Sequence, residues 1–129
     1  MHYFFYGTLL DRGLLARVIG RPVPEARIEG ATLKGYRRLR MAGTPYPMLA
    51  RERGTRVDGI LVRGLDQTAA RRLADYEGAR YTVQVLPVVG SRSGVARARV
   101  FMAKPGIKPS CEPWDFERRF NNAQERPGS

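Results

Sequence analysis

Two runs of strand-forming residues, Tyr81–Val89 and Val95–Met102, are separated only by the short loop sequence GSRSG. This arrangement is typical of a β-hairpin. Two further strand-forming segments precede it: Ala26–Met41, which Gly35 divides, and Val57–Val62. Because so many strands must bury their apolar sides against one another, we expect a sheet that curls into a closed or half-closed β-barrel.

Helical patterns are few and short. Apolar residues recur at helical spacing in Asp11–Ile19, and Asp66 is placed to cap a helix that runs to about Tyr76. The first residues, Met1–Tyr6, form an aromatic strand that a glycine ends. The predicted fold class is therefore α+β (mixed), a small barrel with flanking short helices.

The chain of 129 residues is expected to form a single domain, residues 1–129. Its core spans about residues 1–104. Residues 105–129 form a C-terminal extension: the proline-rich stretch Pro105–Pro113 reads as a linker, and the sequence WDFERRF predicts a short helix. In the middle of the chain, two prolines flank Tyr46 in TPYPMLA, which indicates a rigid extended segment.

Charge and cysteine content narrow the class of protein. The chain has 23 Lys and Arg against 12 Asp and Glu, a net charge of +11. The arginines are spread along the chain rather than gathered, so we expect no specific nucleic-acid partner. The single cysteine, Cys111, fits a cytoplasmic protein, and no apolar stretch is long enough to cross a membrane.

Several common catalytic sets are missing from the sequence. His2 is the only histidine, Cys111 has no histidine near it in sequence, and YGTLLDRG lacks the lysine and spacing of a phosphate-binding loop. The sequence contains no cluster of Cys and His residues that could bind a metal ion. We therefore expect neither a metal nor a cofactor. An enzyme built from this inventory would use carboxylates, tyrosines and backbone amides.

Glu77 is the first candidate. On the helix from Asp66, Ala69, Leu73 and Tyr76 form an apolar face, and Glu77 follows Leu73 by one turn on that side. Burial and the helix C-terminus would both raise the pKa of this carboxyl toward the range of a general acid and base. The alternative is a solvated glutamate at a frayed helix end, and the spacing alone does not decide between them.

The turn Tyr6-Gly7-Thr8-Leu9 is the second candidate. Successive amides in a turn that leads into a helix can form an anion-binding concavity, and Thr8 adds a hydroxyl donor. The alternative is a turn that merely ends a strand.

Taken together, these stretches resemble the gamma-glutamylcyclotransferase-like family, which includes the avirulence-induced-gene-two-like proteins and the gamma-glutamylamine cyclotransferases. The resemblance lies in YGTL at the N-terminus, YEG at a helix end, the following strand YTVQVLPV and the intervening PYPML. It covers Met1 to about Lys104 and implies a small mixed barrel with flanking helices.

The resemblance also implies an activity and a site. The family forms 5-oxoproline from γ-glutamyl compounds: the substrate's own α-amine attacks its γ-carbonyl and the distal amine leaves. By this resemblance, Glu77 is the general acid and base, and substrate-binding residues are Tyr6, Gly7, Thr8, Leu9, Tyr81 and, less directly, Tyr46. The expected partner is a small γ-glutamyl substrate, with weak self-association left open. Two other functions remain open: a binding module for a small acidic ligand, and a basic adaptor for polyanions.

Overall fold

The two longest strands, β2 (Ile28–Met41) and β3 (Pro47–Val62), pair antiparallel along almost their whole length in the computed structural model, which describes residues 1–114. The register runs from Ile28 opposite Val62 to Arg40 opposite Pro47, with one irregularity at Gly35. Gly35 has φ of +84°, a conformation that glycine adopts without a steric penalty. The two strand segments expected around Gly35 are thus one bent strand.

The predicted hairpin is confirmed. β4 (Tyr81–Gly90) and β5 (Gly94–Ala103) are antiparallel, with Tyr81 opposite Ala103 and Gly90 opposite Gly94. At its tip β4 also pairs with β2, through Gly90 with Ala31 and Val89 with Thr32.

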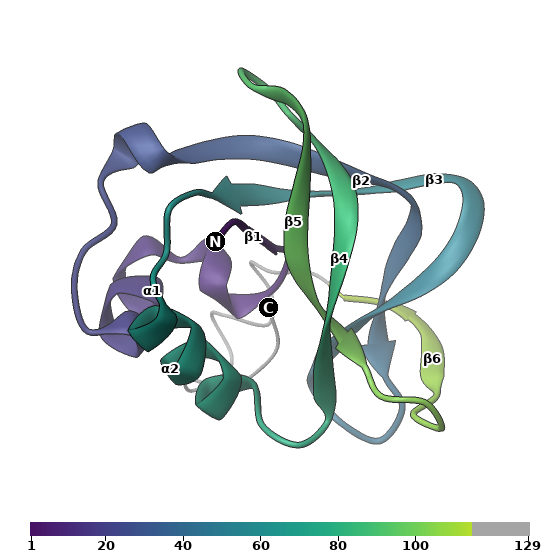
Figure 1. Cartoon of the computed structure of the whole chain (residues 1–129). Coiled ribbons are helices and arrows are strands. Elements are labelled where there is room, and N and C mark those ends of the chain that lie inside the picture. Colours follow the sequence, from purple (N-terminus) through teal and green to yellow (C-terminus); the bar gives the residue numbers. More distant parts are fainter. Residues whose placement is uncertain (115–129) are drawn as a thin grey trace.

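The first strand, β1 (Tyr3–Phe5), completes the ring. It pairs antiparallel with β3 and parallel with β5, so the order β3-β1-β5-β4-β2 returns to β3 and the barrel is closed. The predicted α+β barrel is therefore confirmed (Figure 1).

Two hydrophobic cores explain the aromatic N-terminal run. Phe4 and Tyr6 point into the barrel interior with Leu61 and Val100, whereas Tyr3 and Phe5 pack in a second core that the helices share. Because β1 is buried on both faces, each of its residues is aromatic rather than every second one.

The helices lie together on one side of the barrel (Figure 1). The α-helices are α1 (Arg12–Ile19) and α2 (Gln67–Glu77). The short 3-10 turn η1 (Thr8–Leu10) leads into α1, and η2 (Glu25–Arg27) leads from α1 toward β2. The side chains of Asp11 and Asp66 cap α1 and α2 by accepting from the amides of Leu14 and Ala69. Both helices follow the boundaries that the sequence predicts.

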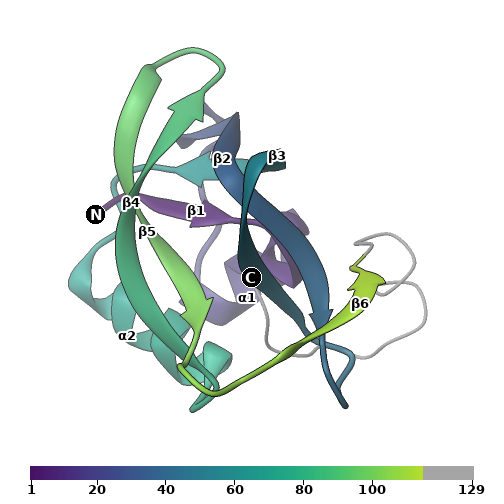
Figure 2. The same ribbon diagram turned by 90° about the vertical axis from the view of Figure 1, so that its right-hand side faces the viewer.

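Two segments differ from expectation. The strand predicted at Val57–Val62 is the end of β3, which begins ten residues earlier at Pro47. Residues Pro109–Pro113, expected as part of a linker, form β6, an edge strand on β2 away from α2 (Figure 2). Prolines are compatible with an edge strand because one side of it needs no ladder donors. Apart from Trp114, the expected helix WDFERRF lies outside the described residues.

Candidate active site

The turn after β1 connects directly to α1. The amide of Leu10 donates to the carbonyl of Gly7 at 3.0 Å and that of Asp11 to Thr8 at 3.2 Å, which forms η1. The first amide that donates within η1 is that of Leu10. The amides of Gly7, Thr8 and Leu9 come before it in the chain, so they take no part in the hydrogen bonds that form η1. Gly7, Thr8 and Leu9 are all buried. This geometry gives backbone donors and one hydroxyl at the end of the aromatic strand.

Glu77 is the last residue of α2 and lies on its buried face. Ala69, Leu73 and Glu77 are buried in steps of one turn, and Gly78 ends the helix. Glu77 is only 2% exposed, and its Oε2 atom is shielded from solvent. The alternative of a solvated glutamate at a frayed helix end is therefore wrong.

Glu77, Tyr6 and Tyr81 lie near one another. Burial raises the pKa of Tyr6 well above its usual value, and the nearby Tyr81 and Glu77 raise it further. Burial also raises the pKa of Tyr81, and the charge of Glu77 is the next cause. Because such effects fall off with distance, the helix end, the strand β4 and the end of β1 meet in one place.

Hydrogen bonds hold the two phenols in place. The Tyr6 hydroxyl donates a short bond to the carbonyl of Phe101, and the Tyr81 hydroxyl donates to that of Pro47 at 2.6 Å. Both bonds are buried, so the rings form fixed walls between the strands. A third hydroxyl links the two halves of the site: the Tyr76 hydroxyl and Thr8 Oγ1 are 3.0 Å apart, which ties the turn to the residue before Glu77.

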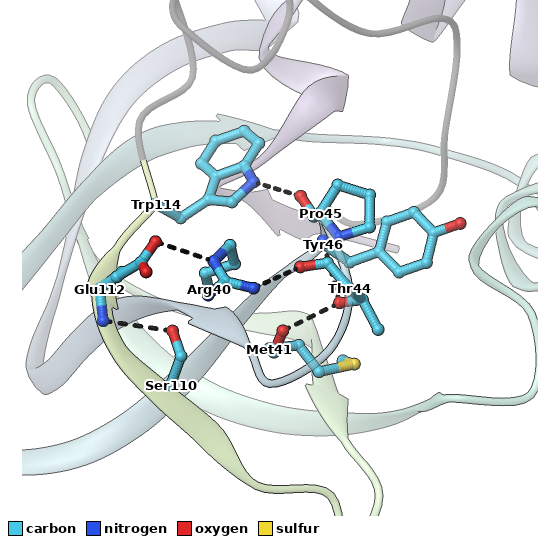
Figure 3. Close-up of polar contacts among 8 residues, drawn as sticks. All are labelled: Arg40, Met41, Thr44, Pro45, Tyr46, Ser110, Glu112 and Trp114. Atoms are coloured by element: carbon cyan, nitrogen blue, oxygen red, sulfur yellow. Dashed lines mark hydrogen bonds and ion pairs between the residues drawn. The ribbon is translucent and has the colours of Figure 1, made fainter.

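Tyr46 is half-buried next to this group. Its proximity contributes to the raised pKa of Tyr81, and the Arg80 guanidinium lies 4.9 Å from the centre of its ring. The turn that carries Tyr46 is held on both sides: the Tyr46 carbonyl accepts from the Met41 amide at 2.7 Å, and Trp114 Nε1 donates to Pro45 at 3.0 Å (Figure 3). All the residues expected from the sequence are thus brought to one end of the barrel.

Arg38 was not expected at the site. Its Nη1 donates to the carbonyl of Tyr6 at 2.6 Å, and its charge opposes the rise in the pKa of Tyr6. It also lies 5.6 Å from the ring centre of Trp114. In the sequence it is one of three arginines in RRLR, and nothing local separates it from its exposed neighbour Arg37.

The two residues considered for other chemistries lie apart from this group. His2 and Cys111 are both exposed. Within residues 1–114, no three His, Cys, Asp or Glu side chains are grouped so that they could hold a metal ion. Over the same residues no helix is long and apolar enough to cross a membrane.

Comparison with known proteins identifies the family of the chain. Residues 3–118 match the family described as "Gamma-glutamyl cyclotransferase, AIG2-like". The chain belongs to this family. Among curated members, Protein AIG2 C of Arabidopsis thaliana is 28% identical over 117 residues, covering 88% of this chain and 68% of that protein.

Solved structures share the AIG2-like fold at low sequence identity. A solution structure from Arabidopsis thaliana has a TM-score of 0.72 and 23% identity, over 94% of this chain and 73% of its own. A structure titled gamma-glutamyl cyclotransferase has a TM-score of 0.66 and 13% identity, over 98% and 88%. An uncharacterized protein from Pyrococcus horikoshii has a TM-score of 0.59 and 19% identity, over 95% of both chains. The fold is thus shared across chains with little common sequence.

Proposed function

We propose that this AIG2-like chain is a cyclotransferase that converts a γ-glutamyl amine or γ-glutamyl amino acid to 5-oxoproline and a free amine. The observation that carries the proposal is the buried Glu77 beside Tyr6 and Tyr81, linked through Tyr76 to the Tyr6–Leu9 turn. Membership of the family supports a cyclotransferase in general terms. The class of substrate and the role of each residue are what we propose beyond membership of the family.

The reaction needs no nucleophile from the protein. The substrate's α-amino nitrogen attacks its own γ-carbonyl carbon, a five-membered lactam ring closes, and the bond from that carbon to the distal nitrogen breaks. From the α-ammonium form the attacking nitrogen loses two protons, one before the attack and one on ring closure. The departing nitrogen gains two and leaves as an ammonium ion, so the protons balance and the reaction consumes no water. The protein must fold the glutamyl chain onto itself, which removes orientational entropy from the barrier.

Glu77 would move the proton. A single carboxylate can accept a proton from the attacking nitrogen and pass one to the departing nitrogen, so the same group acts first as base and then as acid. Burial and the helix C-terminus both disfavour the charged carboxylate, which suits a group that must alternate between the two states.

The turn would bind the developing charge. The amides of Gly7, Thr8 and Leu9 and the Thr8 hydroxyl are the donors for the oxyanion on the γ-carbonyl, because preorganised donors stabilise it most. Tyr6, Tyr81 and Tyr46 would enclose the glutamyl chain. We place the reaction in the cytoplasm, where the single cysteine would stay reduced.

The test is release of 5-oxoproline from a panel of γ-glutamyl amines and γ-glutamyl amino acids, with Glu77→Gln in parallel. We expect turnover in the natural protein and its loss in the variant. A panel that gives no turnover in either protein would overturn the proposal. Tight binding of the panel without turnover would favour the binding module instead.

A further inference from the structure

One edge of β4 is left without a neighbouring strand. β4 meets β2 only at Val89 and Gly90, and the two strands then separate, as Figure 2 shows. Within residues 1–114, the preceding residues 81–88 pair with β5 alone. On every second residue of this stretch the backbone N–H and C=O point away from β5, where no strand of the described chain lies beside them.

This free edge lacks the usual protection against the addition of a strand. Edge strands are normally guarded by charged side chains, and β4, with the sequence YTVQVLPVVG, contains none. Residues 82–85 are all exposed. Pro87 cannot donate to a ladder, so it limits the usable edge to residues 81–86, which we call the β4 edge.

The outer face beside the β4 edge is apolar at one end and basic at the other. Val83 and Val85 are 37% and 45% exposed. On β5, Arg99 lies directly opposite Val85, and Arg97 lies opposite Pro87. Both arginines are exposed, and neither forms an ion pair within residues 1–114. Residues 81–103 contain no Asp or Glu, so the hairpin itself offers these arginines no carboxylate.

We propose that the β4 edge binds an acidic segment of another protein, which adds to it as an extended strand. The backbone of this segment would continue the ladder of the hairpin, and an apolar side chain would lie against Val83. Carboxylates at the level of Val85 would reach Arg97 and Arg99 on β5. Two strand spacings, about 10 Å, separate β5 from the added strand, and an arginine and a glutamate side chain together span that distance. This surface takes no part in the proposed reaction.

Charge favours this partner over a second copy of the chain. Each chain carries a net charge of +11, and pairing β4 with β4 would bring Arg97 and Arg99 of both copies to one face. A nucleic acid would match the arginines, but it has no peptide ladder to pair with the β4 edge. An acidic peptide strand matches both the arginines and the ladder.

Two synthetic peptides with blocked ends test the proposal. ETETVTVT and VTVTETET place glutamates and valines on one face of a strand, for the two directions along β4. We expect one of them to bind the full chain with a Kd of about 100 μM or tighter in fluorescence anisotropy, and more weakly as salt is added. Hydrogen exchange of amides in the β4 edge should slow when it binds.

N-methylation of the peptide separates strand addition from simple charge attraction. Methyl groups on every second residue, in either phase, block the donors on one edge of the peptide and leave its charge unchanged. We expect one of the two methylated forms to lose at least about tenfold in affinity and the other to keep it, because only one edge of the added strand faces β4.

Variants of the protein test the side chains. Arg97→Gln and Arg99→Gln should each weaken binding about twofold to fivefold, with Arg71→Gln, an exposed arginine on α2, as the matched control. Val83→Thr should weaken it about threefold, with Val95→Thr, a 73% exposed valine near the hairpin tip, as its control. Thermal unfolding shows that each variant is folded.

Several results would overturn the proposal. They are no binding of either peptide up to about 1 mM, equal binding of both methylated forms and the parent peptide, and unchanged affinity in both arginine variants. Self-association in sedimentation that Val85→Lys abolishes would assign the β4 edge to a second copy instead. Tighter binding of a single-stranded oligonucleotide than of both peptides, lost in the arginine variants, would assign it to a polyanion. None of these measurements uses turnover, so this inference and the proposed function stand or fall separately.

Discussion

Among residues 1–114, Glu29 and Glu77 are the glutamates that the fold buries, at 3% and 2% exposure. They lie at opposite ends of the β4–β5 hairpin: Glu29 contacts Arg92 and Ser93 at its tip, and Glu77 lies near Tyr81 at its base. Two glutamates buried to about the same extent, one from β2 and one from α2, therefore lie against the two ends of one hairpin.

Their surroundings differ in kind. Glu29 accepts from the amides of Arg92 and Ser93 at 2.7 and 3.1 Å, accepts from Ser93 Oγ at 2.7 Å, and pairs with Arg63 at 3.1 Å. The Ser93 and Arg92 hydrogen bonds are the main causes that lower the pKa of Glu29 to about 2. Such a carboxylate stays ionised and holds the hairpin tip to β2.

Glu77 is surrounded by phenols at the end of a helix. The charge of Glu77 raises the pKa of Tyr6 and of Tyr81. Both phenol hydroxyls donate their hydrogen bonds to backbone carbonyls and not to Glu77. Burial alone therefore does not separate a structural carboxylate from the proposed catalytic one. The catalytic role proposed for Glu77 rests on its neighbours as well as on its burial.

The sharpest test of this difference is Glu77→Gln, the variant already named for the proposed reaction. We expect turnover to fall by about a thousandfold or more, because the variant cannot carry the proton. The free energy of unfolding should change by less than about 1 kcal/mol, since the amide keeps the size of the side chain. Kinetics of 5-oxoproline release and urea denaturation measure the two quantities. Retained turnover would contradict the role of Glu77.

Glu29→Gln should show the reverse pattern. An amide nitrogen would face donors that now meet a carboxylate, so we expect a loss of about 3 kcal/mol in the free energy of unfolding at pH 7. Turnover per folded molecule should be unchanged within about twofold, because Glu29 lies at the other end of the hairpin.

Glu52→Gln is the matched control for this variant. Glu52 is half-exposed and its pair with Arg37 is long, at 3.7 Å, so its replacement should cost less than about 0.5 kcal/mol. Equal losses in Glu29→Gln and Glu52→Gln would show that the bonds to Glu29 do not stabilise the barrel.

Acid should remove the contribution of Glu29 selectively. Its pKa is about 2 in the folded protein against an ordinary 4.5, so its contribution is complete above pH 4.5 and is lost as the pH falls toward 2. The difference in unfolding free energy between the natural protein and Glu29→Gln should shrink by about 2 kcal/mol from pH 7 to pH 3. Denaturation curves at both pH values measure this, and a constant difference would contradict the lowered pKa.

Gly90→Ala should strain the same site without removing the charge. A Cβ at Gly90 would lie 2.7 Å from both Glu29 Oε2 and Ser93 Oγ, so the hydrogen bonds must shift. We expect a loss of about 1–2 kcal/mol in thermal or urea unfolding. Gly30→Ala is the matched control, because its nearest atom would be Ser91 Oγ at 3.9 Å and the effect should be close to zero. An unchanged stability in Gly90→Ala would mean that the Glu29 site is loosely packed.

The smallest expected effect is at the Glu77 end. Tyr76→Phe removes the hydroxyl that lies 3.0 Å from Thr8 Oγ1, so the turn is less firmly held beside the helix. We expect kcat/KM to fall by about threefold to tenfold, in line with one hydrogen bond. Tyr36→Phe removes a phenol from β2 outside the site and serves as the control. A loss of the same size in both variants would deny Tyr76 a role in positioning the turn.

Local sequence signals made one of the two glutamates a candidate. Asp66 starts the helix, and counting in turns from Ala69 reaches Leu73 and then Glu77, which places Glu77 on the apolar face. The spacing did not decide between a buried and a solvated carboxylate, because that depends on what packs against the helix end. The hairpin, the helix boundaries and the Tyr6–Leu9 turn could be predicted, since each depends on neighbours within a few residues.

The remaining features depend on contacts between distant residues. Glu29 is buried because Arg63 and the tip at Arg92 and Ser93 come to it from elsewhere in the chain. Arg38 approaches Tyr6 only once β1 and β2 belong to one barrel. β6 has no alternating pattern and is rich in proline, so only its pairing with β2 reveals it.

The closure of the barrel by β1 has a consequence for folding. Tyr3 pairs with Val62 on one side and Arg99 on the other, so β1 cannot take its place until two strands far along the chain are already formed. Contacts of such long sequence separation form late, because the loop entropy must be overcome before the contact stabilises the chain. The turn that follows β1 would then be ordered in the last step. Under the proposed function, recovery of turnover during refolding should lag behind the signals of hairpin and helix formation. Turnover would then report the closure of the barrel.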